Sequence, residues 1–203
     1  MSASFITSST VTGESSGKLI VISGPAGVGK DTLLARALTA LPDLVKSVSM
    51  TTRPRGPGEE NGRSYFFVSD DEFLRLRDAG ELLEWAEVFQ HFYGTPAKWV
   101  REQVVAGHNV VMNIDVQGGL QIKRKFPEAL LVFVRPPGDP LITLRARLKA
   151  RGRDSDAEID VRLANAAEEL QRAVDYDFQI INDDADRAAA EFVRIISEPK
   201  PLT

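Results

Sequence analysis

The sequence contains no cysteine, which excludes disulfides, thiolate metal sites and cysteine nucleophiles together. It has only two histidines, His91 and His108, too few for a histidine-rich metal site. No apolar run approaches the roughly 20 residues that a bilayer-spanning helix needs, and the N-terminus lacks the build of a secretory signal. We therefore expect a cytoplasmic protein with no membrane partner.

The chain also lacks an excess of positive charge. It has 25 Lys and Arg against 29 Asp and Glu, a net charge of −4, so we expect no nucleic-acid partner. Any phosphate binding must depend on a local site. A chain of 203 residues, 43% of them hydrophobic, fits one domain with a substantial core and leaves little room for two.

Four short apolar stretches rich in β-branched residues are each followed by a segment with helical periodicity. This repetition predicts an α/β fold, a parallel sheet with helices on both faces. The four stretches are 18–23, 109–114, 130–134 and 178–181.

Two segments depart from this repetition. Residues 47–95 combine a loop rich in Pro and Gly with short strand patterns and predict an inserted, partly antiparallel lobe. Residues 141–174 hold two charged helical segments joined at a glycine, with Ser155 or Asp154 as the cap of the second, and suit a mobile lid. The predicted organisation is a flexible leader at 1–17 and a single domain at 18–203, with its core at 18–46, 96–140 and 175–198.

Residues 24–30 match the phosphate-loop pattern G-x-x-x-x-G-K between a predicted strand and a predicted helix. The glycines let backbone N–H groups surround a phosphate, and Lys30 reaches the β and γ oxygens. A tight glycine turn without a ligand is the alternative. The predicted ATP-binding residues here are Gly24, Pro25, Ala26, Gly27, Val28, Gly29, Lys30, Asp31 and Thr32.

Asp31 stands where the pattern has a Ser or Thr that contacts Mg²⁺. A carboxylate near phosphates is repulsive unless it faces the metal, its water shell or an arginine. Asp31 is therefore either an outer-sphere metal ligand or an acid that points away at the start of the helix. We assign no certain metal ligand and expect Mg²⁺ as the cofactor that accompanies ATP.

Six further motifs follow one another in a fixed order. They are Ser-Met-Thr-Thr-Arg-Pro-Arg-Gly-Pro-Gly-Glu at 49–59, Leu-Glu-Trp-Ala at 83–86, Tyr-Gly-Thr at 93–95, Ile-Asp-Val-Gln-Gly at 114–118, Arg-Leu-Lys-Ala-Arg-Gly-Arg at 147–153 and Ile-Asn-Asp-Asp at 181–184. With the phosphate loop, they resemble the guanylate kinase family over residues 18–196. The resemblance implies a P-loop nucleoside monophosphate kinase that uses ATP and GMP or dGMP.

The phosphate of GMP requires forked cationic donors and hydroxyls, which Arg53, Arg55, Tyr65 and Tyr93 can supply. The second phosphate arginine of the family usually lies three residues after the first, where this chain has Gly56. Structural roles are the alternative, with the tyrosines as packing residues and Arg55 as a solvated loop charge.

Guanine presents two adjacent donors, N1–H and the exocyclic amine, and the carboxylate of Glu84 can accept both. Adenine has the opposite pattern at that edge, so a buried Glu84 would discriminate against it by about 10⁴ or more. The resemblance adds the hydroxyls of Ser49 and Thr95 on the guanine side and Asp115 below the base. The family often has Asp where this chain has Asn113.

Arg147 and Arg151 are four residues apart and share one face of a helix, and Arg162 follows in the next predicted helix. The resemblance implies that these three arginines close over the phosphates, where they would stabilise the transferred charge together with Lys30. A solvated helix face is the alternative. Asn182 resembles the residue that approaches adenine.

The predicted reaction is in-line transfer of the γ-phosphoryl group of ATP to GMP, catalysed by a monomer or homodimer. Two alternatives remain at this point. One is a guanylate-kinase-like module that binds proteins without catalysis, and the other is a related P-loop kinase for another phosphorylated acceptor.

Overall fold

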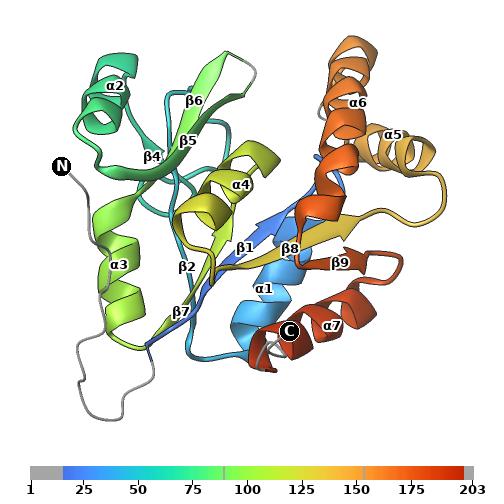
Figure 1. The fold of residues 1–203 in the computed structure, drawn as a ribbon. Coiled ribbons are helices and arrows are strands. Elements are labelled where there is room, and N and C mark those ends of the chain that lie inside the picture. The colour runs from blue at the N-terminus through green and yellow to red at the C-terminus, as the bar shows by residue number, and fades with distance from the viewer. Residues whose placement is uncertain (1–15, 89, 153, 199–203) are drawn as a thin grey trace.

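A computed structural model describes residues 16–88, 90–152 and 154–198 and confirms the predicted α/β fold class (Figure 1). Its central sheet has five parallel strands in the order β2-β7-β1-β8-β9. Four of these strands were predicted to within one residue. The fifth, β2, has three residues, too few for a recognisable period. The strands are β1 (Leu19–Ser23), β2 (Leu44–Lys46), β7 (Asn109–Asn113), β8 (Leu130–Arg135) and β9 (Phe178–Ile181).

Helices cover both faces of this sheet, because successive strand residues point to opposite sides. Ile20 and Ile22 of β1 pack in a core with helices α1 (Lys30–Ala40) and α7 (Ala185–Ser197). Val21 packs in a second core with α3 (Ala97–Val105) and α4 (Val116–Lys125). All three β1 residues are fully buried, so the strand that leads into the phosphate loop is fixed from both sides.

A second sheet of four strands lies beside the first, in the order β4-β3-β6-β5 (Figure 1). Strand β6 pairs antiparallel with β3 and β5, whereas β3 and β4 are parallel. Helix α2 (Asp70–Asp78), capped by Ser69, buries Phe73 against this sheet. The strands are β3 (Met50–Thr51), β4 (Phe66–Phe67), β5 (Leu82–Val88) and β6 (His91–Pro96).

Two helices, α5 (Pro140–Arg151) and α6 (Asp156–Gln171), pack against each other above the carboxyl ends of the central strands. Of the two candidate caps, Ser155 is the one that caps α6, through a capping box with Glu158. Gly152 ends α5 with a φ of 62°. The short 3₁₀ helix η1 (Arg172–Asp175) then leads into β9.

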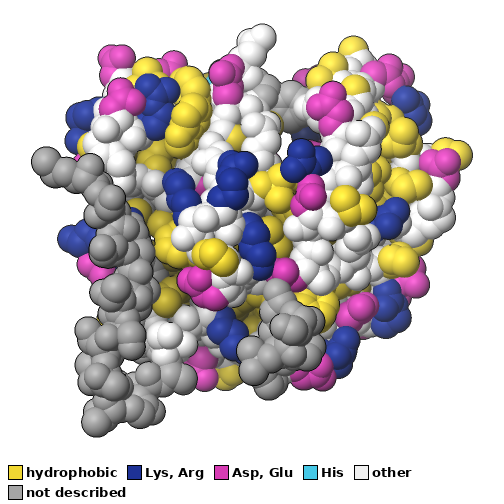
Figure 2. All heavy atoms as spheres, in the orientation of Figure 1, with side chains coloured by type: hydrophobic (Ala, Val, Ile, Leu, Met, Phe, Trp, Pro, Cys, Tyr) yellow, Lys and Arg dark blue, Asp and Glu magenta, His cyan; other side chains and the backbone are white. Residues whose placement is uncertain are grey.

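The predicted leader is described only at its end, where the Gly17 N–H donates to the Val104 carbonyl at 2.9 Å. Residues 1–15 and 199–203 and the motif residue Arg153 lie outside the described residues. Within the ranges that the structure describes, no helix is long and apolar enough to cross a membrane. On the face drawn in Figure 2, Lys and Arg side chains are interspersed with Asp and Glu.

Candidate active site

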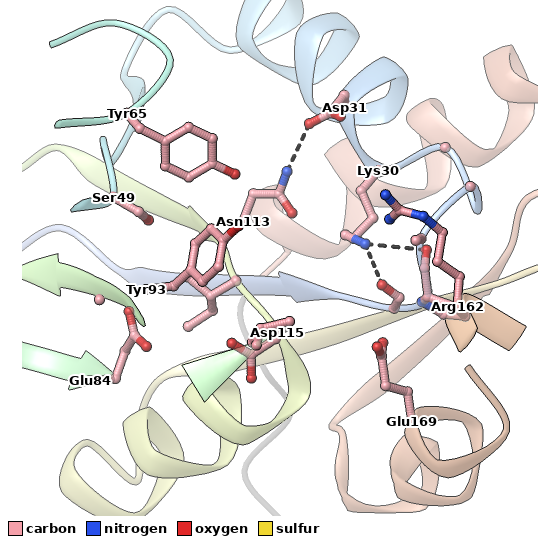
Figure 3. Close-up of a pocket in the computed structure, with 18 of the residues that line it drawn as sticks. Lys30, Asp31, Ser49, Tyr65, Glu84, Tyr93, Asn113, Asp115, Arg162 and Glu169 are labelled. Atoms are coloured by element: carbon pink, nitrogen blue, oxygen red, sulfur yellow. Dashed lines mark hydrogen bonds between the residues drawn. The ribbon is translucent and has the colours of Figure 1, made fainter. Parts of the chain in front are cut away.

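A cleft of about 370 Å³ lies at the carboxyl ends of β1 and β7, where the central sheet meets the second sheet and helices α5 and α6. Ligands commonly bind at this edge of an open α/β sheet. Figure 3 shows side chains from the phosphate loop, the second sheet and α6 pointing toward one another across it. The predicted residues that line it are Gly24, Pro25, Ala26, Gly27, Gly29, Lys30, Asp31, Ser49, Tyr65, Glu84, Tyr93, Asp115, Arg151 and Arg162.

The phosphate loop presents Lys30 at the first position of α1. Its ammonium donates to the carbonyls of Gly24 and Pro25, the latter at 3.3 Å (Figure 3). Burial lowers the pKa of Lys30, while the nearby carboxylates of Glu169 and Asp31 raise it. Lys30 is thus a partly buried cation held by loop carbonyls, and an anionic phosphate would be a stronger partner for it.

Arg147 and Asn182 hold the back of this loop and do not line the cleft. Arg147 donates to the carbonyls of Val28 and Asn182 at 3.2 and 2.8 Å, and the Asn182 amide donates to Val28 at 2.7 Å. Gly29 fits against this amide with a φ of 101°, and a Cβ there would come within 2.4 Å of it. Of the three predicted lid arginines, two therefore face the cleft. Thr32 is exposed and lies outside the lining.

Glu84 lies at the opposite end of the cleft and is 2% exposed. The Thr95 hydroxyl donates to its Oε1 at 2.7 Å, and Ser49 Oγ lies 3.3 Å from Thr95 Oγ1. Gly118 leaves room for the other oxygen, since a Cβ at that position would lie 2.6 Å from Glu84 Oε2. Thr95 does not line the cleft itself and contacts it through Glu84 and Ser49.

The pKa of Glu84 is raised to about 7, mainly by burial and also by the negative charge of Asp115. The hydrogen bond from Thr95 and the positive charge of Lys125 act in the opposite direction. The carboxylate therefore changes its charge near neutral pH, where any ligand that donates hydrogen bonds to it would favour the ionised form.

Tyr65 and Tyr93 line the cleft beside Glu84, with ring centroids 6.0 Å apart. Arg53 lies behind them, its Cζ 5.7 Å from the Tyr65 ring centre, and pairs with Glu59. Arg55 is exposed and forms no hydrogen bond or ion pair with the rest of the described chain, so its surroundings match the solvated loop charge. The structure brings one of the two predicted phosphate arginines next to the tyrosines.

Sequence reasoning missed Glu169 and assigned Asn113 no role in the site, although both line the cleft. Asn113 donates to Asp31 at 2.9 Å, so two residues that depart from the expected patterns contact each other. Glu169 points into the cleft from α6 (Figure 3). Its pKa is raised by burial and lowered by the charge of Lys30. The sequence signal for Glu169 was its place in a charged helical segment. Such segments are usually solvated helix faces, so this signal does not identify a site residue.

A family model described as guanylate kinase matches residues 16–199. The chain belongs to the guanylate kinase family. Guanylate kinase from Caldanaerobacter subterraneus subsp. tengcongensis is 44% identical over 184 residues, which cover 91% of this chain and 88% of the relative. The guanylate kinase of a Nostoc species is 49% identical over 173 residues, 85% of this chain and 86% of the relative.

The crystal structure of guanylate kinase from Anaplasma phagocytophilum has the same fold, with a TM-score of 0.73. The two sequences are 34% identical, and the matched region covers 90% of this chain and 86% of the Anaplasma chain. The family resemblance inferred from the motifs is thus confirmed, together with the enzyme class, a nucleoside monophosphate kinase.

Proposed function

We propose that this guanylate kinase transfers the γ-phosphoryl group of ATP to GMP or dGMP within the cleft described above. One observation carries the proposal. A single cleft joins a phosphate loop with its lysine, Lys30, to a buried carboxylate, Glu84, on a separate sheet. The first group suits a triphosphate, and the second suits a base with two adjacent N–H donors.

On the donor side, Lys30 would exchange its loop carbonyls for the β and γ oxygens of ATP, and the loop amides at the start of α1 would surround the phosphates. Arg147 and Asn182 would keep the loop in shape from behind, through their bonds to Val28. Through this support, these two residues outside the cleft would affect ATP binding.

On the acceptor side, Glu84 would accept from N1–H and the exocyclic amine of guanine, with Thr95 fixing its orientation. Ser49 and Asp115 would contact the base from the same end of the cleft. The acceptor phosphate would then lie toward Tyr65 and Tyr93, whose hydroxyls can donate to it. Arg53 supplies a guanidinium behind the two rings.

Between the two nucleotides, Arg151 and Arg162 would stabilise the charge that develops on the transferred group. Gly152 caps the end of α5 and Ser155 caps the start of α6, so a change of backbone angles at Gly152 would close the arginines over the phosphates. Closure also excludes water, which protects ATP from hydrolysis. The transfer needs no covalent enzyme intermediate.

Mg²⁺ would be held mainly by the phosphates of ATP. Within the described ranges, no three His, Asp or Glu side chains gather as a metal site. Asp31 nevertheless fits such an ion, because it lines the cleft next to Lys30 and the Asn113 amide fixes its carboxylate. When bound, Mg²⁺ neutralises phosphate charge.

An assay of ADP release across GMP, dGMP, AMP, UMP and IMP tests the proposal. We expect turnover with GMP and dGMP, much weaker use of IMP, which lacks the exocyclic amine, and almost none of AMP. Preference for a different acceptor would identify a related kinase instead. No ADP with any acceptor would identify a binding module without catalysis.

A further inference from the structure

Glu59 holds Arg53 next to Tyr65, on the acceptor side, through a two-pronged ion pair. Arg53 Nη2 donates to Glu59 Oε1 at 2.7 Å and to Oε2 at 3.0 Å. The two side chains are 30% and 26% exposed, so water screens the pair only in part. The hydrogen bond from Arg53 lowers the pKa of Glu59, and that of Arg53 is raised in turn, so both groups stay charged.

The same carboxylate also shapes the loop that carries Arg53. The Gly56 N–H donates to Glu59 Oε2 at 2.7 Å. Arg53 Nη1 donates to the Pro54 carbonyl at 2.8 Å, and its backbone N–H donates to Thr51 Oγ1 at 3.1 Å. The guanidinium is therefore fixed to its own loop at several points before any ligand is present.

The ion pair holds the guanidinium next to Tyr65, which lines the cleft at the predicted phosphate position. Its Cζ lies 5.7 Å from the ring centre of Tyr65 and 5.8 Å from that of Phe67. The rings of Tyr65 and Tyr93 pack edge to face, with their centroids 6.0 Å apart. A guanidinium carries five N–H donors in one plane. Pairing with Glu59 and Pro54 leaves the guanidinium with unused donors beside Tyr65, one of the two tyrosines that line the cleft.

We propose that Glu59 is a positioning residue for the acceptor phosphate. It acts through Arg53, whose flexible side chain it orders in advance, so that less conformational entropy is lost when the phosphate binds. The inference rests on the proposed function, since it takes the acceptor to be a nucleoside monophosphate. It predicts that Glu59 contributes to GMP binding and not to ATP binding.

Glu59→Gln tests the idea with little change in volume, and the amide oxygen can still accept from Gly56. We expect the KM for GMP to rise roughly tenfold or more, the scale of one charge-assisted hydrogen bond, with kcat and the KM for ATP little changed. Glu60→Ala is the control, because Glu60 is the adjacent loop acid and its side chain forms an exposed ion pair with Arg63. This control should leave both KM values unchanged.

Inhibition by guanosine distinguishes a loss of Arg53 positioning from general damage to the acceptor loop. Guanosine lacks the phosphate, so its inhibition constant should be the same for wild type and Glu59→Gln. A double-mutant cycle with Arg53→Met provides the second readout, since Glu59→Gln should add no further loss once Arg53 is gone.

Three results would overturn the inference: an unchanged or lower KM for GMP, an equal loss of guanosine binding, or additive losses in the cycle. A wild-type protein that makes no GDP would instead refute the proposed function, so the two failures are distinguishable.

Discussion

Lowering the pH from 8 to 6 should weaken GMP binding about tenfold through the titration of Glu84. Its pKa of about 7 in the free enzyme leaves roughly nine tenths of the protein with the ionised carboxylate at pH 8 and about one tenth at pH 6. Guanine donates two hydrogen bonds at this edge and therefore requires the ionised form. The apparent KM for GMP should rise by the ratio of these fractions.

Burial of Glu84 also lowers the free energy of unfolding at a pH where the carboxylate is ionised. The pKa of Glu84 rises from 4.5 to about 7 on folding, so its neutral form favours the folded state below pH 4.5 and this contribution is lost as the pH rises through 7. The rise corresponds to at most about 3 kcal/mol. Glu84→Gln removes the buried charge and should unfold at higher denaturant concentration than wild type at pH 8, by a margin that shrinks toward pH 5.

Steady-state kinetics at saturating ATP across this pH range, run in parallel on wild type and Glu84→Gln, are the assay. The phosphate of GMP titrates near pH 6, but it does so equally for both proteins, so the ratio of their KM values isolates Glu84. Parallel pH profiles for the two proteins would refute the reasoning, as would a variant that binds GMP as tightly as wild type at pH 8.

The remaining predictions concern the donor side. Lys30→Met should lower kcat by orders of magnitude while the far-UV circular dichroism and thermal midpoint stay close to wild type; near-normal turnover in a folded variant would contradict the role of Lys30. Arg151→Ala should lower kcat by at least about 10², whereas Arg147→Ala should mainly raise the KM for ATP, because Arg147 contacts the loop backbone and not the cleft. Asp31→Asn should increase the Mg²⁺ concentration for half-maximal activity several-fold, with Glu72→Gln as an exposed control, and an unchanged requirement would show that Asp31 does not face the metal.

Much of the fold could be predicted because its signals are local. The strands are apolar because they are buried on both faces of the sheet. The glycine pattern at 24–30 reflects the backbone freedom that a phosphate loop needs. Ser155 was one of two candidate caps from sequence, and its reciprocal bonds with Glu158 decide between them. Strand β2, with three residues, is defined by its pairing with β7 rather than by its own pattern.

The candidate site could be predicted only in part, since its remaining contacts join distant segments. Asn113 and Asp31 are 82 positions apart, and no spacing rule links them. Arg147 and Arg151 are spaced to share one face of a helix. In the structure Arg147 contacts the backbone of the loop, whereas Arg151, one turn later, lines the cleft. Glu59 is the last residue of the motif at 49–59, and the motif alone gives it no role. Its role follows from the fold of the loop, which brings its carboxylate within 2.7 Å of Arg53 Nη2.

The most direct test is the product balance of the purified protein with ATP, GMP and Mg²⁺. Chromatography would measure the two substrates, ATP and GMP, and the two products, ADP and GDP. A cleft in which Lys30 and Glu84 serve two nucleotides at once predicts ADP and GDP in equal amounts, with almost no ADP when GMP is left out. ADP without matching GDP, or neither product, would contradict it.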